Sequence, residues 1–120
     1  MSKKINIKQK FSKFYDLWSP KVIAEMNDYQ FKIVKIHGEF VWHKHDETDE
    51  VFIVIEGNMK IQFRKKTINL NQGELFIVPK GVEHKPFAAE LCKIMIVEPR
   101  GVMNTGNINN ELTAKNDTWI

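Results

Sequence analysis

Beyond Pro20 the chain consists of short segments in which apolar and polar residues alternate, or in which β-branched residues follow one another. Residues two apart on a strand share a face, so this pattern predicts strands rather than helices. Glycine, asparagine, aspartate and proline stand between the segments and favour turns. We expect strands at 22–25, 29–37, 40–45, 51–56, 59–63, 66–70, 75–78 and 90–97. Many short strands of this kind predict an all-β sandwich or barrel.

The two ends of the chain differ from this pattern. Only residues 7–17 show helical spacing, which predicts a short helical segment at the amino terminus. From Pro99 onward the chain is rich in asparagine and has few apolar residues, but it ends in Trp119 and Ile120. Because such an apolar pair is unfavourable in water, we expect an extended arm that lies over the barrel or over a partner subunit. The predicted organisation is a packing segment at 1–20, a barrel at 21–98 and the arm at 99–120.

Composition narrows the class of protein. With 120 residues, of which 42% are hydrophobic, the chain can build one core but not two. Its net charge of +3 is mild, and no basic strand with interleaved aromatic residues accompanies the lysines near the amino terminus. We therefore expect these lysines to form a solvated face, and we expect no nucleic-acid partner. The cluster comprises Lys3, Lys4, Lys8, Lys10 and Lys13.

The start of the chain and its cysteine content indicate a compartment. No apolar run reaches eighteen residues, and MSKKINIKQKF lacks the apolar stretch of a signal peptide, so we expect a cytoplasmic protein with no membrane partner. A single cysteine, Cys92, excludes an internal disulfide and a cysteine-based zinc site. Its neighbours in ELCKIMIVEP predict a strand, in which Cys92 is a small buried residue rather than a nucleophile.

Candidate chemistry begins at the stretch VWHKHDETDEVFIVIEG, residues 41–57. His43 and His45 are two residues apart, so on a strand both rings project from one face and reach a single metal ion, while Lys44 points away. The acidic turn that follows lets the chain reverse. Glu50 then begins a strand whose two faces are both apolar, and a buried carboxylate there needs a cation or hydrogen-bond partners.

His84 follows a strand and a proline–glycine turn in GELFIVPKGVEH. In a closed barrel its ring can face inward, toward His43 and His45. Three imidazoles and the Glu50 carboxylate form a nitrogen and oxygen donor set, which suits iron, manganese, nickel, cobalt or zinc better than calcium. We therefore predict that His43, His45, Glu50 and His84 bind a divalent transition metal with positions open for water or an oxygen-bearing ligand.

Two stretches of the chain resemble the motifs of small single-domain cupins. The first, GEFVWHKHDETDEVFIVIEG at 38–57, has one residue fewer after its first glycine than the family motif. The second, GELFIVPKGVEHKPFA at 73–88, ends in Ala88 where the family has asparagine. The resemblance implies an antiparallel jelly-roll β-barrel whose metal ligands are the four residues named above. Neither difference from the family motifs removes a ligand. The missing residue shortens a loop, and Ala88 in place of asparagine affects only residues that would contact the ligands.

The function predicted from the sequence stays general, because one fold serves many chemistries. Our first hypothesis is a metal-binding cupin that holds a small oxygen-bearing molecule; relatives implied by the resemblance include dioxygenases and sugar isomerases or epimerases. Whether the chain is an enzyme is left open, because no second carboxylate or lysine is clearly placed as a base. Glu39, which has the same parity as His43 and His45, is the candidate general base, although a solvated glutamate at a strand end is the simpler interpretation.

Two alternatives remain at this point. The first is a non-catalytic module that senses or stores a small molecule, and the second is a structural cupin without metal. In each case we expect a homodimer, because exposed sheet edges and apolar terminal segments, such as Trp18 and Trp119–Ile120, favour pairing.

Overall fold

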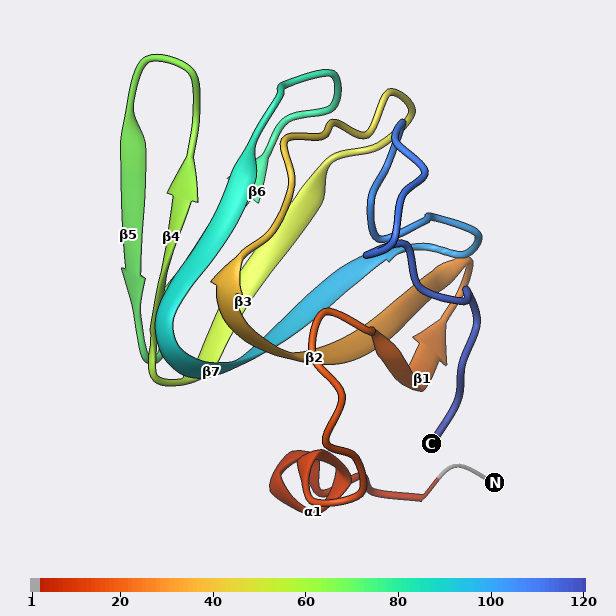
Figure 1. Ribbon diagram of the computed structural model, residues 1–120. Coiled ribbons are helices and arrows are strands. Elements are labelled where there is room, and N and C mark those ends of the chain that lie inside the picture. Colours follow the sequence, from red (N-terminus) through yellow and green to blue (C-terminus); the bar gives the residue numbers. More distant parts are fainter. Residues whose placement is uncertain (1–2) are drawn as a thin grey trace.

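A computed structural model describes residues 3–120 and shows a strongly curved sheet with one short helix beneath it (Figure 1). Met1 and Ser2, which belong to the predicted segment 1–20, lie outside the described residues. The elements are α1 (Ile7–Phe11), β1 (Lys21–Met26), β2 (Tyr29–Glu39), β3 (Glu50–Glu56), β4 (Asn58–Gln62), β5 (Thr67–Asn71), β6 (Leu75–Val78) and β7 (Lys85–Pro99). No helix within residues 3–120 has the length and apolar character needed to cross a bilayer.

Strand β7 connects the whole sheet. It pairs antiparallel with β2, β3 and β4, and the path of neighbouring strands runs β1, β2, β7, β3, β6, while β4 also pairs with β5. The long strands β2 and β7 bend, so that the sheet curls around a common interior (Figure 1). The predicted all-β, antiparallel barrel is therefore confirmed.

Apolar residues form two clusters on opposite faces of this sheet. One fills the barrel interior and includes Trp18, Phe40, Phe52 and Ile94. The other lies between α1 and the outer face of β1, β2 and β7, and comprises Phe11, Phe14, Ile23, Ile33 and Met95. Ile53 and Ile55 of β3 pack against this second cluster while Phe52 and Val54 face the first, so both faces of β3 are apolar, as expected.

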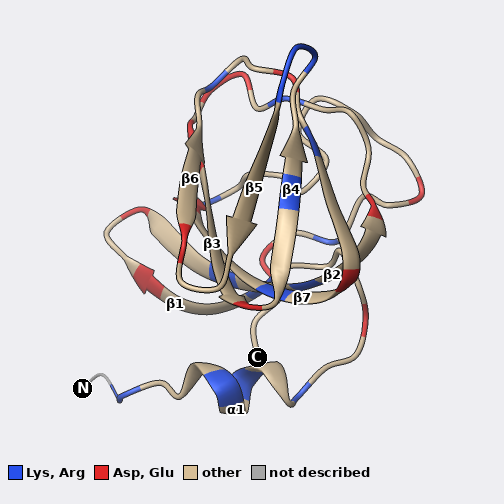
Figure 2. Ribbon diagram, turned by 90° about the vertical axis from the view of Figure 1, so that its left-hand side faces the viewer, with Lys and Arg blue, Asp and Glu red and all other residues tan. Residues whose placement is uncertain are grey.

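The predicted helix at 7–17 is wrong in its length, because the helix ends at Phe11. The backbone carbonyl of Phe14 accepts a 2.6 Å hydrogen bond from Lys35 Nζ instead of continuing a helix. Trp18 has a φ of 59°, a left-handed conformation that no α-helix admits. Figure 2 places the lysines of α1 below the barrel, while a second basic group, Arg64, Lys65 and Lys66, forms the β4–β5 turn.

The predicted strand at 40–45 is also wrong, since only His43 forms a bridge there, with His84. Two contacts of this segment with other parts of the same chain explain this. Pro86 lies opposite Phe40 and has no N–H to donate, although its carbonyl accepts from Phe40 N at 3.0 Å. On the other side, Lys44 N donates to the side chain of Asn107. Strand β7 begins at Lys85, five residues before the predicted start at 90.

The segment from Pro99 to Ile120 lies across its own barrel (Figure 1). Asn104 Nδ2 donates to the carbonyls of Trp18 and Leu112, at 2.9 and 2.8 Å, and ties the segment to the residues before β1. At its end Trp119 forms a parallel bridge with Val22. Ile120 packs on the outer apolar cluster, whereas the Trp119 side chain is still half exposed.

Candidate metal centre

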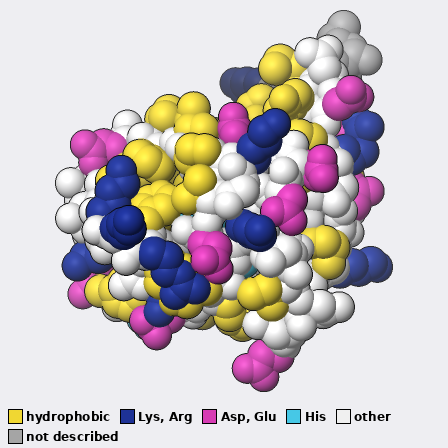
Figure 3. Space-filling view, turned by 90° about the horizontal axis from the view of Figure 1, so that it is seen from above, with side chains coloured by type: hydrophobic (Ala, Val, Ile, Leu, Met, Phe, Trp, Pro, Cys, Tyr) yellow, Lys and Arg dark blue, Asp and Glu magenta, His cyan; other side chains and the backbone are white. Residues whose placement is uncertain are grey.

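The four predicted ligand residues come together inside the barrel. His43 and His45 lie between β2 and β3, Glu50 is the first residue of β3, and His84 immediately precedes β7. One donor atom from each lies within 4.8 Å of the others, and all four residues are buried. From above, histidine side chains are almost completely hidden (Figure 3). The cluster could hold one metal ion.

Backbone hydrogen bonds fix His43 opposite His84. His43 N donates to His84 O at 3.0 Å, and His84 N donates to His43 O at 2.9 Å. Each ring also has its Nδ1 2.9 Å from a carbonyl two residues earlier, that of Val41 for His43 and that of Val82 for His84. A carbonyl only accepts, so each Nδ1 donates its proton there, and Nε2 is the nitrogen that each ring can offer to an ion.

Glu50 Oε1 is shared between two imidazoles. It lies 3.2 Å from His45 Nε2 and 3.3 Å from His84 Nε2. Among residues 3–120, His45 Nε2 nevertheless finds no hydrogen-bond partner in this buried position. A buried nitrogen without a partner costs free energy, and a metal ion among these atoms would satisfy it. The donor set therefore fits a divalent transition ion.

The charge state of the cluster also suits a cation. Burial opposes ionisation of Glu50, but the contacts with His45 and His84 outweigh it and lower the Glu50 pKa to about 2. Burial, with help from His84, lowers the pKa of His43 to about 4. Burial also acts to lower the pKa of His45, but the neighbouring Glu50 carboxylate prevails and the pKa is raised. At neutral pH, Glu50 is therefore ionised and His43 is neutral.

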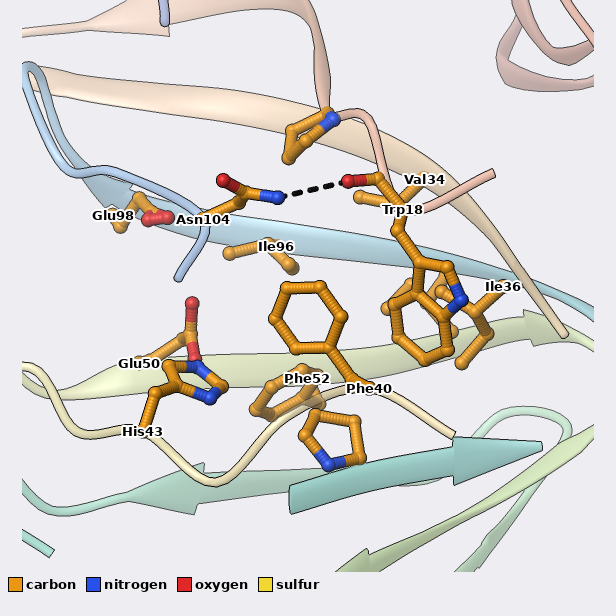
Figure 4. A pocket seen from close by; sticks show the side chains of 13 residues that line it. Trp18, Val34, Ile36, Phe40, His43, Glu50, Phe52, Ile96, Glu98 and Asn104 are labelled. Carbon is orange, nitrogen blue, oxygen red and sulfur yellow. Dashed lines mark hydrogen bonds between the residues drawn. The ribbon is translucent and has the colours of Figure 1, made fainter. Parts of the chain in front are cut away.

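A small cavity extends from the cluster into the barrel (Figure 4). About 30 Å³ of it is open to the centres of water molecules, enough for about two waters. Its polar wall contains His43, Glu50, Glu98 and Asn104, and its apolar wall contains Trp18, Val34, Ile36, Phe40, Phe52 and Ile96. Trp18 and Phe40 stack with ring centroids 4.7 Å apart, and Phe40 meets His43 edge-on.

This arrangement of strands agrees with comparisons with known proteins. Residues 31–98 match the family model described as "Cupin domain". The chain belongs to the cupin family. A crystal structure of a cupin-2 domain protein from Shewanella frigidimarina is 66% identical, with a TM-score of 0.79, and the match covers 80% of this chain and 94% of that one. Protein NMB1881 from Neisseria meningitidis is 31% identical, with a TM-score of 0.75, over 81% and 99% of the two chains.

A curated relative is also similar in sequence. This is the uncharacterized protein YdbB of Bacillus subtilis, 39% identical over 64 residues. The match covers 52% of this cupin and 57% of YdbB, so it spans little more than half of either chain.

The carboxy-terminal arm holds the ligand segment of this cupin from outside. Asn107 N donates to Lys44 O at 3.1 Å, and Asn107 Oδ1 accepts from Lys44 N at 3.0 Å. Gly106, with a φ of 59°, lies so close that a Cβ there would collide with Lys44 O and touch the His43 ring. The arm therefore restrains the backbone between His43 and His45.

The predicted general base Glu39 does not face the cavity of this cupin. Its side chain is 59% exposed and pairs with Lys85 Nζ at 3.1 Å. The parity argument fails because β2 ends at Glu39 and residues 40–42 form no strand, so side chains no longer alternate regularly between Glu39 and His43. Lys44 is turned toward Asp46, 3.3 Å away, as its position between two inward histidines predicts.

Two buried charged residues near the cluster escaped the sequence analysis. Glu98 and Lys32 are each 2% exposed, and their charged groups lie 3.8 Å apart. Burial and the neighbouring Glu50 raise the pKa of Glu98 to about 8. Their strands carried a usable signal, since Glu98 has the parity of Ile94 and Ile96, and Lys32 that of Val34 and Ile36.

Cys92 is fully buried and has no role at the site. Burial raises the pKa of its thiol to about 11, so the thiolate is scarce at neutral pH. Its predicted position as a small buried residue in a strand is confirmed.

Proposed function

We propose that this cupin binds a divalent transition metal through His43, His45, Glu50 and His84 and uses it to hold a small oxygen-bearing molecule. The observation that carries the proposal is His45 Nε2, which is buried without a hydrogen-bond partner among three other candidate donor atoms. Iron, manganese, nickel, cobalt and zinc all suit the nitrogen and oxygen donors.

A dication with one carboxylate ligand keeps about one positive charge and stabilises negative charge on a ligand oxygen. The protein's own residues supply the rest of the site. Val41 O and Val82 O orient two of the rings, and the arm restrains the segment that carries His43 and His45. Trp18, Phe40 and Phe52 cover the apolar side of the cavity and keep bulk water from it.

We further propose that the bound molecule is a substrate, in a dioxygenase or isomerase type of reaction. Glu98 supports this reading, because a buried carboxyl group at the cavity can exchange a proton with a bound molecule. The alternative is a sensing or storage module, for which metal-dependent binding without turnover would be expected.

The first test is elemental analysis of protein purified without an affinity tag or chelator. We expect about one transition-metal ion per chain in the wild type. His45→Ala and His84→Ala should each lower occupancy sharply, because each removes one of four donors. Lys44→Ala is the matched control: it lies between two ligands, points away, and should leave occupancy unchanged.

Equal occupancy in all three variants would contradict the assignment of the site. No metal in the wild type, even after reconstitution with each of the five ions, would contradict the proposed function as a whole.

A further inference from the structure

Glu98 of β7 is a buried carboxylate with an unused oxygen. Its residue is 2% exposed, and its Oε2 makes no hydrogen bond. The carboxylate lines the same cavity as Glu50 and His43, and Figure 4 shows both carboxylates on the polar wall. A buried oxygen of this kind needs a donor, and here the donor must come from the cavity.

The sheet places Glu98 beside the metal cluster. Val51 and Val97 are partners in the antiparallel ladder of β3 and β7, so Glu50 and Glu98 stand opposite each other one step further on. Side chains at such positions have Cβ atoms about 4.5–5.5 Å apart, and like charges placed there are unfavourable. A second ionisable carboxyl group buried beside Glu50 therefore costs stability, whether it is charged or protonated, which favours a role in binding over a purely structural one.

Lys32 pairs with Glu98 but does not satisfy it. Its Nζ lies 3.8 Å from Glu98 Oε1, beyond hydrogen-bond distance, and donates instead to Val102 O at 3.3 Å. A buried ion pair gives little or no net stability compared with apolar residues of similar size. The pair compensates part of the negative charge on the cavity wall and leaves Oε2 available.

We propose that Glu98 Oε2 is a second anchor of the cavity, which binds a hydroxyl group of the small molecule whose other oxygen is held at the four-residue cluster. This inference rests on the proposed metal-dependent binding. A hydroxyl both donates and accepts, so it satisfies Glu98 whether the carboxyl group is ionised or protonated.

The proposed ligand class follows from the cavity. A small hydroxy acid or hydroxy ketone offers one oxygen function to the cluster and a hydroxyl to Glu98. Space for about two waters beyond the donors limits the enclosed part to a few heavy atoms. Any remaining carbon atoms of the ligand would contact Phe40 and Phe52.

The test compares two probes that differ by one hydroxyl, glycolate and acetate, on protein loaded with Co²⁺. Binding is measured through the visible absorption of the ion, and Co²⁺ occupancy is measured separately for every variant. In the wild type we expect glycolate to bind more tightly than acetate by about 3- to 10-fold, the usual effect of one additional hydrogen bond.

Removing Glu98 alone would leave Lys32 buried without a partner and could prevent folding. The main variant is therefore Lys32→Met with Glu98→Met, in which apolar residues replace both charges. We expect its preference for glycolate to fall by about 3- to 10-fold while Co²⁺ occupancy stays complete. Glu98→Gln, which keeps an acceptor oxygen, should lose less of the preference.

Glu56→Gln is the matched control, because Glu56 also pairs with a strand lysine, Lys93, at 3.3 Å, but is exposed and outside the cavity. It should keep the wild-type preference. The inference is overturned if the double variant keeps that preference. It is also overturned if the Co²⁺-loaded wild type binds the two probes equally well or binds neither of them. Failure of the wild type to hold Co²⁺ would instead overturn the metal site itself.

Discussion

The two walls of the cavity have opposite character, although strands β3 and β7 contribute to both. On each of these strands a charged and an apolar residue two positions apart line the cavity: Glu50 and Phe52 on β3, and Glu98 and Ile96 on β7. On β2, Val34 lines the apolar wall, and Lys32, two positions earlier, pairs with Glu98. Strand geometry therefore decides which way each side chain points, and the residue type at each position decides whether the wall is polar or apolar there. We expect the polar wall to govern the binding of ligands and the apolar wall to govern the stability of the fold.

Substitution of the apolar wall should have the largest effect. Ile36→Ala removes a fully buried side chain and should lower the free energy of unfolding by about 2–5 kcal/mol, because it leaves a cavity in the core. Metal stoichiometry of the folded protein should not change, since Ile36 is not one of the clustered donors. Denaturant unfolding and elemental analysis measure the two quantities.

The milder Ile36→Val keeps this comparison measurable if the alanine variant does not fold, with an expected loss of about 0.5–1.5 kcal/mol. Loss of metal in a stably folded Ile36 variant would show that metal binding depends on the apolar wall as well as on the polar wall.

A change of pH should act on the polar wall alone. The pKa of His45 is raised above its usual value of 6.5 in the metal-free protein, but a metal ligand must be neutral. Metal affinity should therefore rise with pH through and above 6.5, by at most about 10-fold or 1.4 kcal/mol per pH unit, and level off above the raised pKa. His43, with its pKa lowered to about 4, adds to this only in more acidic solution.

Competition against a chelator of known pH dependence, between pH 5.5 and 8.5, measures this slope. An affinity that falls as the pH rises through this range would contradict the assigned charge states.

A substitution outside the barrel should have the smallest effect on both walls. Ile77 is 54% exposed on β6, which ends the path of paired strands, so Ile77→Lys should change stability by less than about 0.5 kcal/mol and leave metal binding unchanged. If the predicted homodimer pairs through this edge, sedimentation should show a shift toward monomer. Leu91→Lys, at a residue 51% exposed on β7, is the control. A dimer unaffected by Ile77→Lys would rule out this edge.

The cluster of His43, His45, Glu50 and His84 could be predicted from the sequence because the spacing of these residues is local. His43 and His45 share a face, the acidic turn precedes Glu50, and a proline–glycine turn precedes His84, so short-range geometry was sufficient. Glu98 and Lys32 lie near the ends of their strands, where a charged residue is usually solvated. Only the meeting of β2, β3 and β7 shows that these positions are enclosed.

The incorrect position of Glu39 has a different cause. Parity relates two residues only while the chain between them is a regular strand, and the strand is interrupted at 40–42, between Glu39 and His43. Pro86 and Asn107 likewise break the strand expected at 40–45, through a missing donor and a side-chain hydrogen bond that no local pattern indicates.

The contact between Gly106 and Lys44 has a kinetic consequence. If His43 and His45 bind an ion as proposed, the arm that lies against the backbone between them opposes the movement by which they would release it. The residence time of the ion would then be set by local opening of the arm, and not by the strength of the four bonds alone. Exchange of one bound ion for another would proceed at the same rate whatever the concentration of the competitor.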